Sequence, residues 1–207
     1  MSTKYTKENL IEFMEQLFKE IYHVNNKLNL HMYIHNKFVD NQGVSDIAIS
    51  YFVITMDSLQ NDMIIQVFKI FDKSGYGTIF KFLNLIEANP HLFTDKKVYI
   101  KVQEDRDKYE NEKRESIKNI TTWRNQLYAH YDKKYFLEKD RLKLADDAPM
   151  LLQDIIDLLN MAVETINYYS GLLDFARFSL ITPEITKDAD KLFESLNFYI
   201  DHRTNNL

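Results

Sequence analysis

Three side chains that could act on a phosphodiester lie close together in the octapeptide from Trp123 to His130, whose sequence is WRNQLYAH. The guanidinium of Arg124 carries a fixed positive charge and a forked set of donors that suits phosphate. The imidazole of His130 titrates near neutral pH when it is unperturbed, and the carboxamide of Asn125 offers both a donor and an acceptor. These groups are sufficient to cleave RNA without a metal ion, so the octapeptide predicts phosphodiester chemistry.

The spacing of Arg124 and His130 sets a condition on that chemistry. On a straight α-helix, residues six positions apart lie about 120° apart around the axis, so the two side chains of one chain do not share a face. Trp123, Leu127 and His130 form one stripe, which could simply pack in a core. If two such helices meet about a two-fold axis, Arg124 and His130 of both chains can line one groove. A composite site in a homodimer would therefore reconcile this spacing with chemistry on one phosphate, and packing in a core is the alternative.

Basic residues are concentrated around the octapeptide, although the chain as a whole has a net charge of −5. Between Lys113 and Lys143, nine basic residues stand against four acidic ones, which gives a local net charge of +5. This contrast predicts a positive field suited to phosphate, while a solvated helix face is the alternative interpretation. The neighbours expected to contact the substrate are Tyr128, Tyr131, Lys133 and Lys134.

The composition limits the fold and the class of protein. The chain has 207 residues with no Cys, four Gly and three Pro. This length fits a single domain over residues 1–207, and the lack of cysteine excludes disulfides and thiolate zinc sites. We see neither an apolar signal core nor an apolar stretch long enough to span a bilayer, so we expect a soluble, cytoplasmic protein without a membrane partner.

Hydrophobic periodicity and the scarcity of Gly and Pro predict an all-α fold, a bundle of about four core helices with one or two extra helices. Helices are predicted over Leu10–Leu28, from about residue 45 to Asp72, and over Ile79–Ala88, Leu151–Ile166 and Thr182–Tyr199. Apolar residues alternate with polar ones from Leu28 to His35, so a strand stays open there, although we favour a helix. The second helix is apolar on nearly all sides and is expected at the centre.

The remaining segments carry more charge. The first half of the segment from Thr94 to His130 is expected to project into solvent or against a partner, because its apolar positions are sparse. Tyr131 to Asp147 is expected to be a basic loop or hairpin.

At these residues the chain resembles the HEPN superfamily of helical domains. That superfamily is defined by an Arg, then four to six residues, then a His, usually with a polar residue directly after the Arg. Here Arg124-Asn125 is followed by four further residues and His130. The motif Trp-Arg-Asn…Ala-His-Tyr-Asp, and the segment Val67 to Asp72 ahead of a short helix, look most like the HEPN branch associated with bacterial abortive-infection phage defence.

The resemblance implies a metal-independent endoribonuclease that acts as a homodimer and needs no cofactor. His130 would be the general base or acid toward the ribose 2′-hydroxyl, Arg124 would hold the scissile phosphate, and Asn125 would orient either one. The products would be a 2′,3′-cyclic phosphate and a 5′-hydroxyl. A domain that has lost activity and binds RNA, nucleotide or a protein partner is the alternative, and a purely helical interaction module is a third interpretation.

The resemblance also implies two kinds of regulatory partner, an antitoxin or a nucleotidyltransferase. In related HEPN toxins a nucleotidyltransferase modifies a Tyr that lies two residues after the His. Asp132 occupies that position here, with Tyr131 and Tyr135 flanking it.

No metal site is predicted from the histidines and carboxylates. Glu20 and His23 have the spacing used in di-iron helical bundles, but a second copy of this motif is missing. His31 and His35 lie one helical turn apart, yet no acidic general base stands between them.

Overall fold

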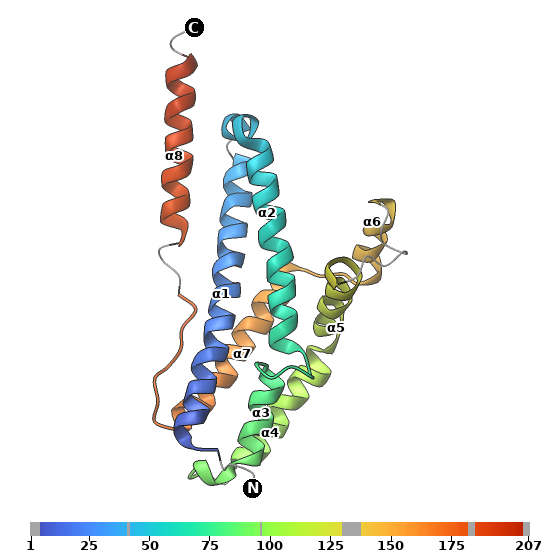
Figure 1. Ribbon diagram of the computed structural model, residues 1–207, viewed down its shortest axis with the longest axis vertical. Coiled ribbons are helices and arrows are strands. Elements are labelled where there is room, and N and C mark those ends of the chain that lie inside the picture. Colours follow the sequence, from blue (N-terminus) through green and yellow to red (C-terminus); the bar gives the residue numbers. More distant parts are fainter. Residues whose placement is uncertain (1–4, 41, 96, 130–137, 182–184, 205–207) are drawn as a thin grey trace. The chain divides into compact units, whose positions relative to one another are not determined.

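The computed structural model describes residues 5–40, 42–95, 97–129, 138–181 and 185–204, with side chains described for all of these except 42–47, 127–129, 138–142 and 203–204. These residues form helices and connections, without a strand (Figure 1). The α-helices are α1 (Lys7–Asp40), α2 (Gln42–Phe71), α3 (Ile79–Ala88), α4 (Val98–Asp107), α5 (Arg114–Trp123), α6 (Glu138–Asp147), α7 (Leu152–Leu172) and α8 (Ile185–Thr204). A 3₁₀ turn, η1, covers Pro90–Leu92, and two π-helical turns are η2 (Lys108–Glu112) and η3 (Arg124–Ala129).

The all-α prediction is confirmed, and the structure corrects it in one segment. α1 continues through residues 28–35, so the helix favoured there is confirmed and the strand alternative is wrong. The expected loop or hairpin from Tyr131 to Asp147 is wrong in its second half, where α6 forms. α3 has the predicted bounds, with the side chain of Thr78 accepting from the backbone N–H of Lys81 at 3.0 Å as its N-cap.

The chain divides into two compact units. Unit 1 comprises Met1–Tyr22 and Ile64–Ser179, and unit 2 comprises His23–Met63 and Leu180–Leu207. α1 and α2 each contribute to both units, whereas α3 to α7 belong to unit 1 and α8 belongs to unit 2. The octapeptide therefore lies in unit 1. No helix in the described part of the chain combines the length and the apolar character that a membrane crossing requires.

Unit 1 has an aliphatic and aromatic core to which α4 contributes. Val98, Val102, Asp105 and Tyr109 are buried and follow one another at spacings of four, three and four residues. This spacing places them on one helix face, and α3 lies beside α4 in the same unit (Figure 1). The expectation that the first half of the charged segment projects outward is therefore wrong, because few apolar residues are enough when they share a face.

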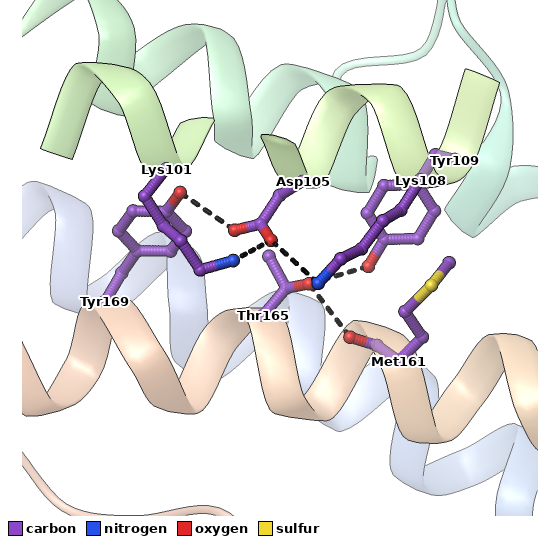
Figure 2. Close-up of polar contacts among 7 residues, drawn as sticks. All are labelled: Lys101, Asp105, Lys108, Tyr109, Met161, Thr165 and Tyr169. Carbon is purple, nitrogen blue, oxygen red and sulfur yellow. Dashed lines mark hydrogen bonds and ion pairs between the residues drawn. The ribbon is translucent and has the colours of Figure 1, made fainter. Parts of the chain in front are cut away.

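A buried carboxylate joins α4 to α7 in this core. Asp105 is 2% exposed and accepts a hydrogen bond from the hydroxyl of Tyr169 at 3.0 Å (Figure 2). The same carboxylate pairs with Lys101 and, at 3.7 Å, with Lys108. Burial, and then the charge of Asp105, raise the pKa of Tyr169, so the phenol stays protonated and serves as a donor.

A second pair of hydroxyls joins η2 to α7. The hydroxyls of Tyr109 and Thr165 lie 2.9 Å apart, and Thr165 donates to the carbonyl of Met161 at 2.9 Å (Figure 2). Burial raises the pKa of Tyr109. These contacts satisfy polar groups that would otherwise be costly in the core, and they fix the π-helical turn η2 against α7.

Unit 2 has a smaller core around Phe52. Its ring stacks on Phe193 of α8, with centroids 5.1 Å apart, and Ile34 of α1 completes the buried cluster. On other sides of α2, four large apolar residues are 41–65% exposed, namely Ile49, Tyr51, Val53 and Ile54. The expectation that the second helix is central is wrong for the part of α2 that belongs to unit 2, because α1 and α8 cover only part of its circumference there.

Candidate functional site

The octapeptide lies where α5 gives way to the π-helical turn η3. The hydroxyls of Thr121 and Thr122 each donate to the backbone carbonyl four residues earlier, at 2.8 and 2.9 Å. Such bonds compete with the regular helical pattern and bend helices, and the widened turn begins two residues later at Arg124. The angle of about 120° between Arg124 and His130 applies to a straight α-helix and does not hold across a π-helical turn.

Arg124 is held by a ring and by its neighbour. Its guanidinium carbon lies 4.5 Å from the centroid of the Phe68 ring at the end of α2, a cation–π contact. Its Nη1 donates to Oδ1 of Asn125 at 2.8 Å. Arg124 is half-buried and Asn125 is exposed, and no carboxylate among the described residues forms an ion pair with Arg124. The positive charge is therefore oriented without being neutralised by these groups.

The helix that carries this pair is anchored to the segment after α6. Nε1 of Trp123 donates to the carbonyl of Ala148 at 2.7 Å, and its ring packs against Leu144 and Ala148. One turn earlier, Nδ2 of Asn119 donates to the carbonyl of Pro149 at 2.7 Å. Trp123 thus has a structural role, as the core-stripe interpretation expected for it. Its anchoring also limits the movement of the adjacent Arg124.

Two further contacts fix α5 to α7. Oγ of Ser116 donates to Asp154 at 3.0 Å, and Nζ of Lys113 lies 3.0 Å from a carboxylate oxygen of Asp157. A hydrogen bond from Gln153, and then the contact with Lys113, lower the pKa of Asp157. Lys113 therefore links the start of α5 to α7.

The positive field expected around the octapeptide is reduced where the structure describes it. Lys118 pairs with Glu115 at 3.2 Å, although both side chains are well exposed and such pairs are weak. Arg114 is exposed and has no ion pair among the described residues. The side chains of Lys139 and Arg141 are not described. Among the described side chains of this segment, Arg114 and Arg124 form no ion pair with a described carboxylate.

The structure brings Arg124 and Asn125 together and leaves the rest of the predicted site undescribed. The backbone of Tyr128 belongs to η3, but its side chain is not among those described. The positions that lie outside the described residues are His130, Tyr131, Lys133 and Lys134.

Phe68 contacts Arg124 but was not predicted as a residue of the site. Its segment, Val67 to Asp72, carries part of the resemblance to a known family, but nothing in its linear spacing points to the octapeptide. A second feature is Gln126, whose Oε1 is buried and has no hydrogen-bond partner among the described residues.

Histidines and carboxylates do not gather elsewhere into an arrangement suited to a metal ion. Among the described residues, no three His, Asp or Glu side chains are grouped as metal ligands. His31 is half-buried in unit 2, and its Nδ1 is buried without a described partner. Burial and then the neighbouring His35 lower the pKa of His31, so its neutral form is favoured.

Comparison with known proteins gives one match. The sequence family described as HEPN_AbiU2 (AbiU2) matches residues 7–192, a range that covers most of both units and includes the octapeptide. No curated protein matches the chain significantly. No solved structure does so either.

Proposed function

We propose, from the premise that the chain belongs to the AbiU2 family of HEPN domains, that it is a metal-independent endoribonuclease of phage defence. AbiU2 is an abortive-infection family, and HEPN domains are often RNases. The observation that carries the proposal is the pair of the half-buried Arg124 and the exposed Asn125, which is held against Phe68 at the start of a widened turn. A charge that is oriented but not neutralised is what binding of a phosphodiester requires.

The proposed chemistry uses the substrate's own nucleophile. His130 removes the proton of the ribose 2′-hydroxyl, the 2′-oxygen attacks the adjacent phosphorus, and the bond from phosphorus to the 5′-oxygen breaks. Arg124 stabilises the negative charge that grows on the phosphate oxygens, and Asn125 keeps the guanidinium in its orientation. The protonated imidazole of His130 then gives a proton to the leaving 5′-oxygen and returns to its neutral form. The products are a 2′,3′-cyclic phosphate and a 5′-hydroxyl.

The catalytic groups come from two chains in this proposal. The π-helical turn begins at Arg124 and ends one residue before His130. In a homodimer, Arg124 and His130 of both protomers line one groove across the two-fold axis. Tyr128 in the turn, and Tyr131, Lys133 and Lys134, which follow it in the sequence, contact the RNA strand, and the exposed Arg114 extends the basic surface along α5.

Cleavage of RNA in excess chelator by the purified full-length protein tests the proposal. We expect Arg124→Ala and His130→Ala each to lower the rate by a factor of about 10² to 10⁴. Arg177→Ala and His91→Ala are matched controls, because both residues are exposed in unit 1 and lie outside the octapeptide. We expect both controls to keep the wild-type rate.

Two outcomes would reject the nuclease. One is cleavage that is equally fast in all four variants, which would indicate a contaminating enzyme. The other is RNA binding that Arg124→Glu abolishes while no product ever forms, which would instead identify a catalytically inactive HEPN domain.

A further inference from the structure

A groove of about 980 Å³ lies in unit 1, and its lining residues do not include Phe68, Arg124 or Asn125 of the proposed nuclease site. One face of α1, from Asn9 to Glu20, forms its length, and Tyr5, the end of α2 and the connection 72–78 form the rest. The α1 face spans about 16 Å at a rise of about 1.5 Å per residue. The groove is therefore elongated, and its volume falls in the range of roughly 300–1,000 Å³ that is typical of small-molecule sites.

The groove has an apolar floor. Phe13, Leu17 and Ile70 line it and are each less than 10% exposed, because their other sides belong to the core of unit 1. Because these side chains are already almost fully buried, a ligand on the floor removes little further apolar surface from water, and its affinity depends mainly on the charges at the rim.

An aromatic wall stands at one end of the floor. The ring of Tyr76 packs edge-on to Phe13, with centroids 5.8 Å apart, and its hydroxyl lies 3.5 Å from that of Tyr5. Burial raises the pKa of Tyr5 to about 12, so this phenol is neutral near pH 7. Nζ of Lys81 lies 5.5 Å from the centroid of the Tyr76 ring, yet the residue is 67% exposed, which leaves the rest of its aromatic surface available to a ligand.

The connection that carries Tyr76 is held in place by its own hydrogen bonds. The carboxylate of Asp72 accepts from the backbone N–H and the hydroxyl of Ser74, at 3.2 and 2.8 Å. The hydroxyl of Thr78 donates to the carbonyl of Gly75 at 3.3 Å. A Cβ at Gly75 would lie 2.7 Å from Cγ2 of Thr78, so this close approach requires glycine. The wall is therefore formed before any ligand binds.

The rim of the groove is acidic. Glu12, Glu20 and Asp72 line it against a single cation, Lys69, which gives a net charge of −2. Glu12 and Glu20 are exposed and lie about 12 Å apart along α1. This charge disfavours phosphate-bearing ligands, and carboxylates separated along an apolar floor match cations separated along an aliphatic chain.

We propose that this groove binds an extended aliphatic polyamine. Its ammonium groups pair with Glu12 and Glu20, a terminal ammonium lies against the exposed surface of Tyr76, and its methylene chain covers Phe13, Leu17 and Ile70. The proposal does not rest on the nuclease activity, since it concerns binding to a separate surface of unit 1.

Titration of the full-length protein with spermidine by calorimetry at physiological ionic strength tests the proposal. We expect saturable one-site binding whose Kd rises about tenfold in the double variant Glu12→Gln, Glu20→Gln. The double variant Glu104→Gln, Glu112→Gln removes the same charge from exposed positions outside the groove and should change Kd less than about twofold. Tyr76→Ala should weaken binding, whereas Tyr99→Ala, which removes an exposed ring of α4, should not.

The result that would overturn the proposal is equal weakening in both double variants, because that would indicate only the general field of an acidic protein. Absence of saturation by spermidine would do the same, as would equally tight binding of its acetylated derivative, which lacks a terminal charge. Circular dichroism should show all four variants folded, since the substituted side chains are exposed and outside the core.

Discussion

At the scale of single residues, the guanidinium of Arg124 is oriented by the Phe68 ring and by Asn125. Both contacts depend on the planar, forked shape of the guanidinium. We therefore predict that Arg124→Lys, which keeps the charge, retains only a small part of the nuclease activity, with a rate reduced by a factor of about 10 to 10². Single-turnover cleavage of a labelled RNA would measure this. A lysine variant as active as the wild type would show that charge alone is sufficient.

Arg124, Asn125 and Phe68 show which parts of the site can be predicted from the sequence. Arg124 and Asn125 were predicted from a linear pattern, because they are adjacent in the sequence and on one turn. Phe68 could not be predicted, because its contact depends on how the end of α2 packs against η3. The roles of His130 and of the flanking tyrosines and lysines stay predictions.

A second residue gives a prediction on pH and stability. His31 has a lowered pKa in the folded protein, because burial and then His35 disfavour its charged form, while Asp57 partly opposes them. The unfolded chain therefore binds this proton more readily than the folded protein does. We predict that the free energy of unfolding decreases as the pH falls below about 6.5, and that His31→Asn flattens this decrease. Urea unfolding between about pH 8 and about pH 5 measures how the free energy of unfolding depends on pH in the wild type and in His31→Asn. The same dependence in both proteins would contradict the lowered pKa of His31.

At the scale of elements, the contact between α4 and α7 depends on one buried carboxylate. Asp105 accepts a hydrogen bond from the hydroxyl of Tyr169. It also forms ion pairs with Lys101 and Lys108, which are partly exposed to water. We predict that Asp105→Asn lowers the free energy of unfolding by about 1–3 kcal/mol, because the hydrogen bond becomes neutral and both ion pairs are lost. The adjacent Glu104→Gln, an exposed change, should stay within about 0.5 kcal/mol. Chemical denaturation with equal midpoints for the two variants would show that the network contributes nothing.

The elements that were predicted correctly share a clear period of apolar residues. α3 and α7 have this period and appear where it places them. α6 does not, because Leu142 and Leu144 are the only large apolar residues in a helix that is otherwise mostly charged. The π-helical turn η3 is likewise not visible in the period of the apolar residues.

The first half of α2 shows what an apolar pattern leaves undecided. Its residues are apolar around the whole helix, which predicts burial only if enough partners surround it. Ile49 and Ile54 are 53% and 65% exposed, because the partners in unit 2 cover one side. The number of neighbours of a helix is a property of the assembled fold and is not encoded in the helix's own sequence.

At the scale of the whole molecule, we propose that the two units belong to one domain, since the AbiU2 match covers residues from both. The composite site requires a dimer of this domain. We predict that analytical sedimentation at micromolar concentration shows a homodimer. In this homodimer, Arg124 and His130 of both protomers would line one groove. A stable monomer under these conditions would leave the two side chains without a shared site.

The most direct test of the nuclease is the chemistry of the RNA ends that it produces in excess chelator. We predict a 2′,3′-cyclic phosphate on one fragment and a 5′-hydroxyl on the other, because the attacking group is the substrate's own 2′-hydroxyl. Mass spectrometry of the products of a short defined RNA distinguishes the possible ends. A 3′-hydroxyl with a 5′-phosphate would mean that water is the nucleophile, and it would contradict the proposed roles of Arg124 and His130.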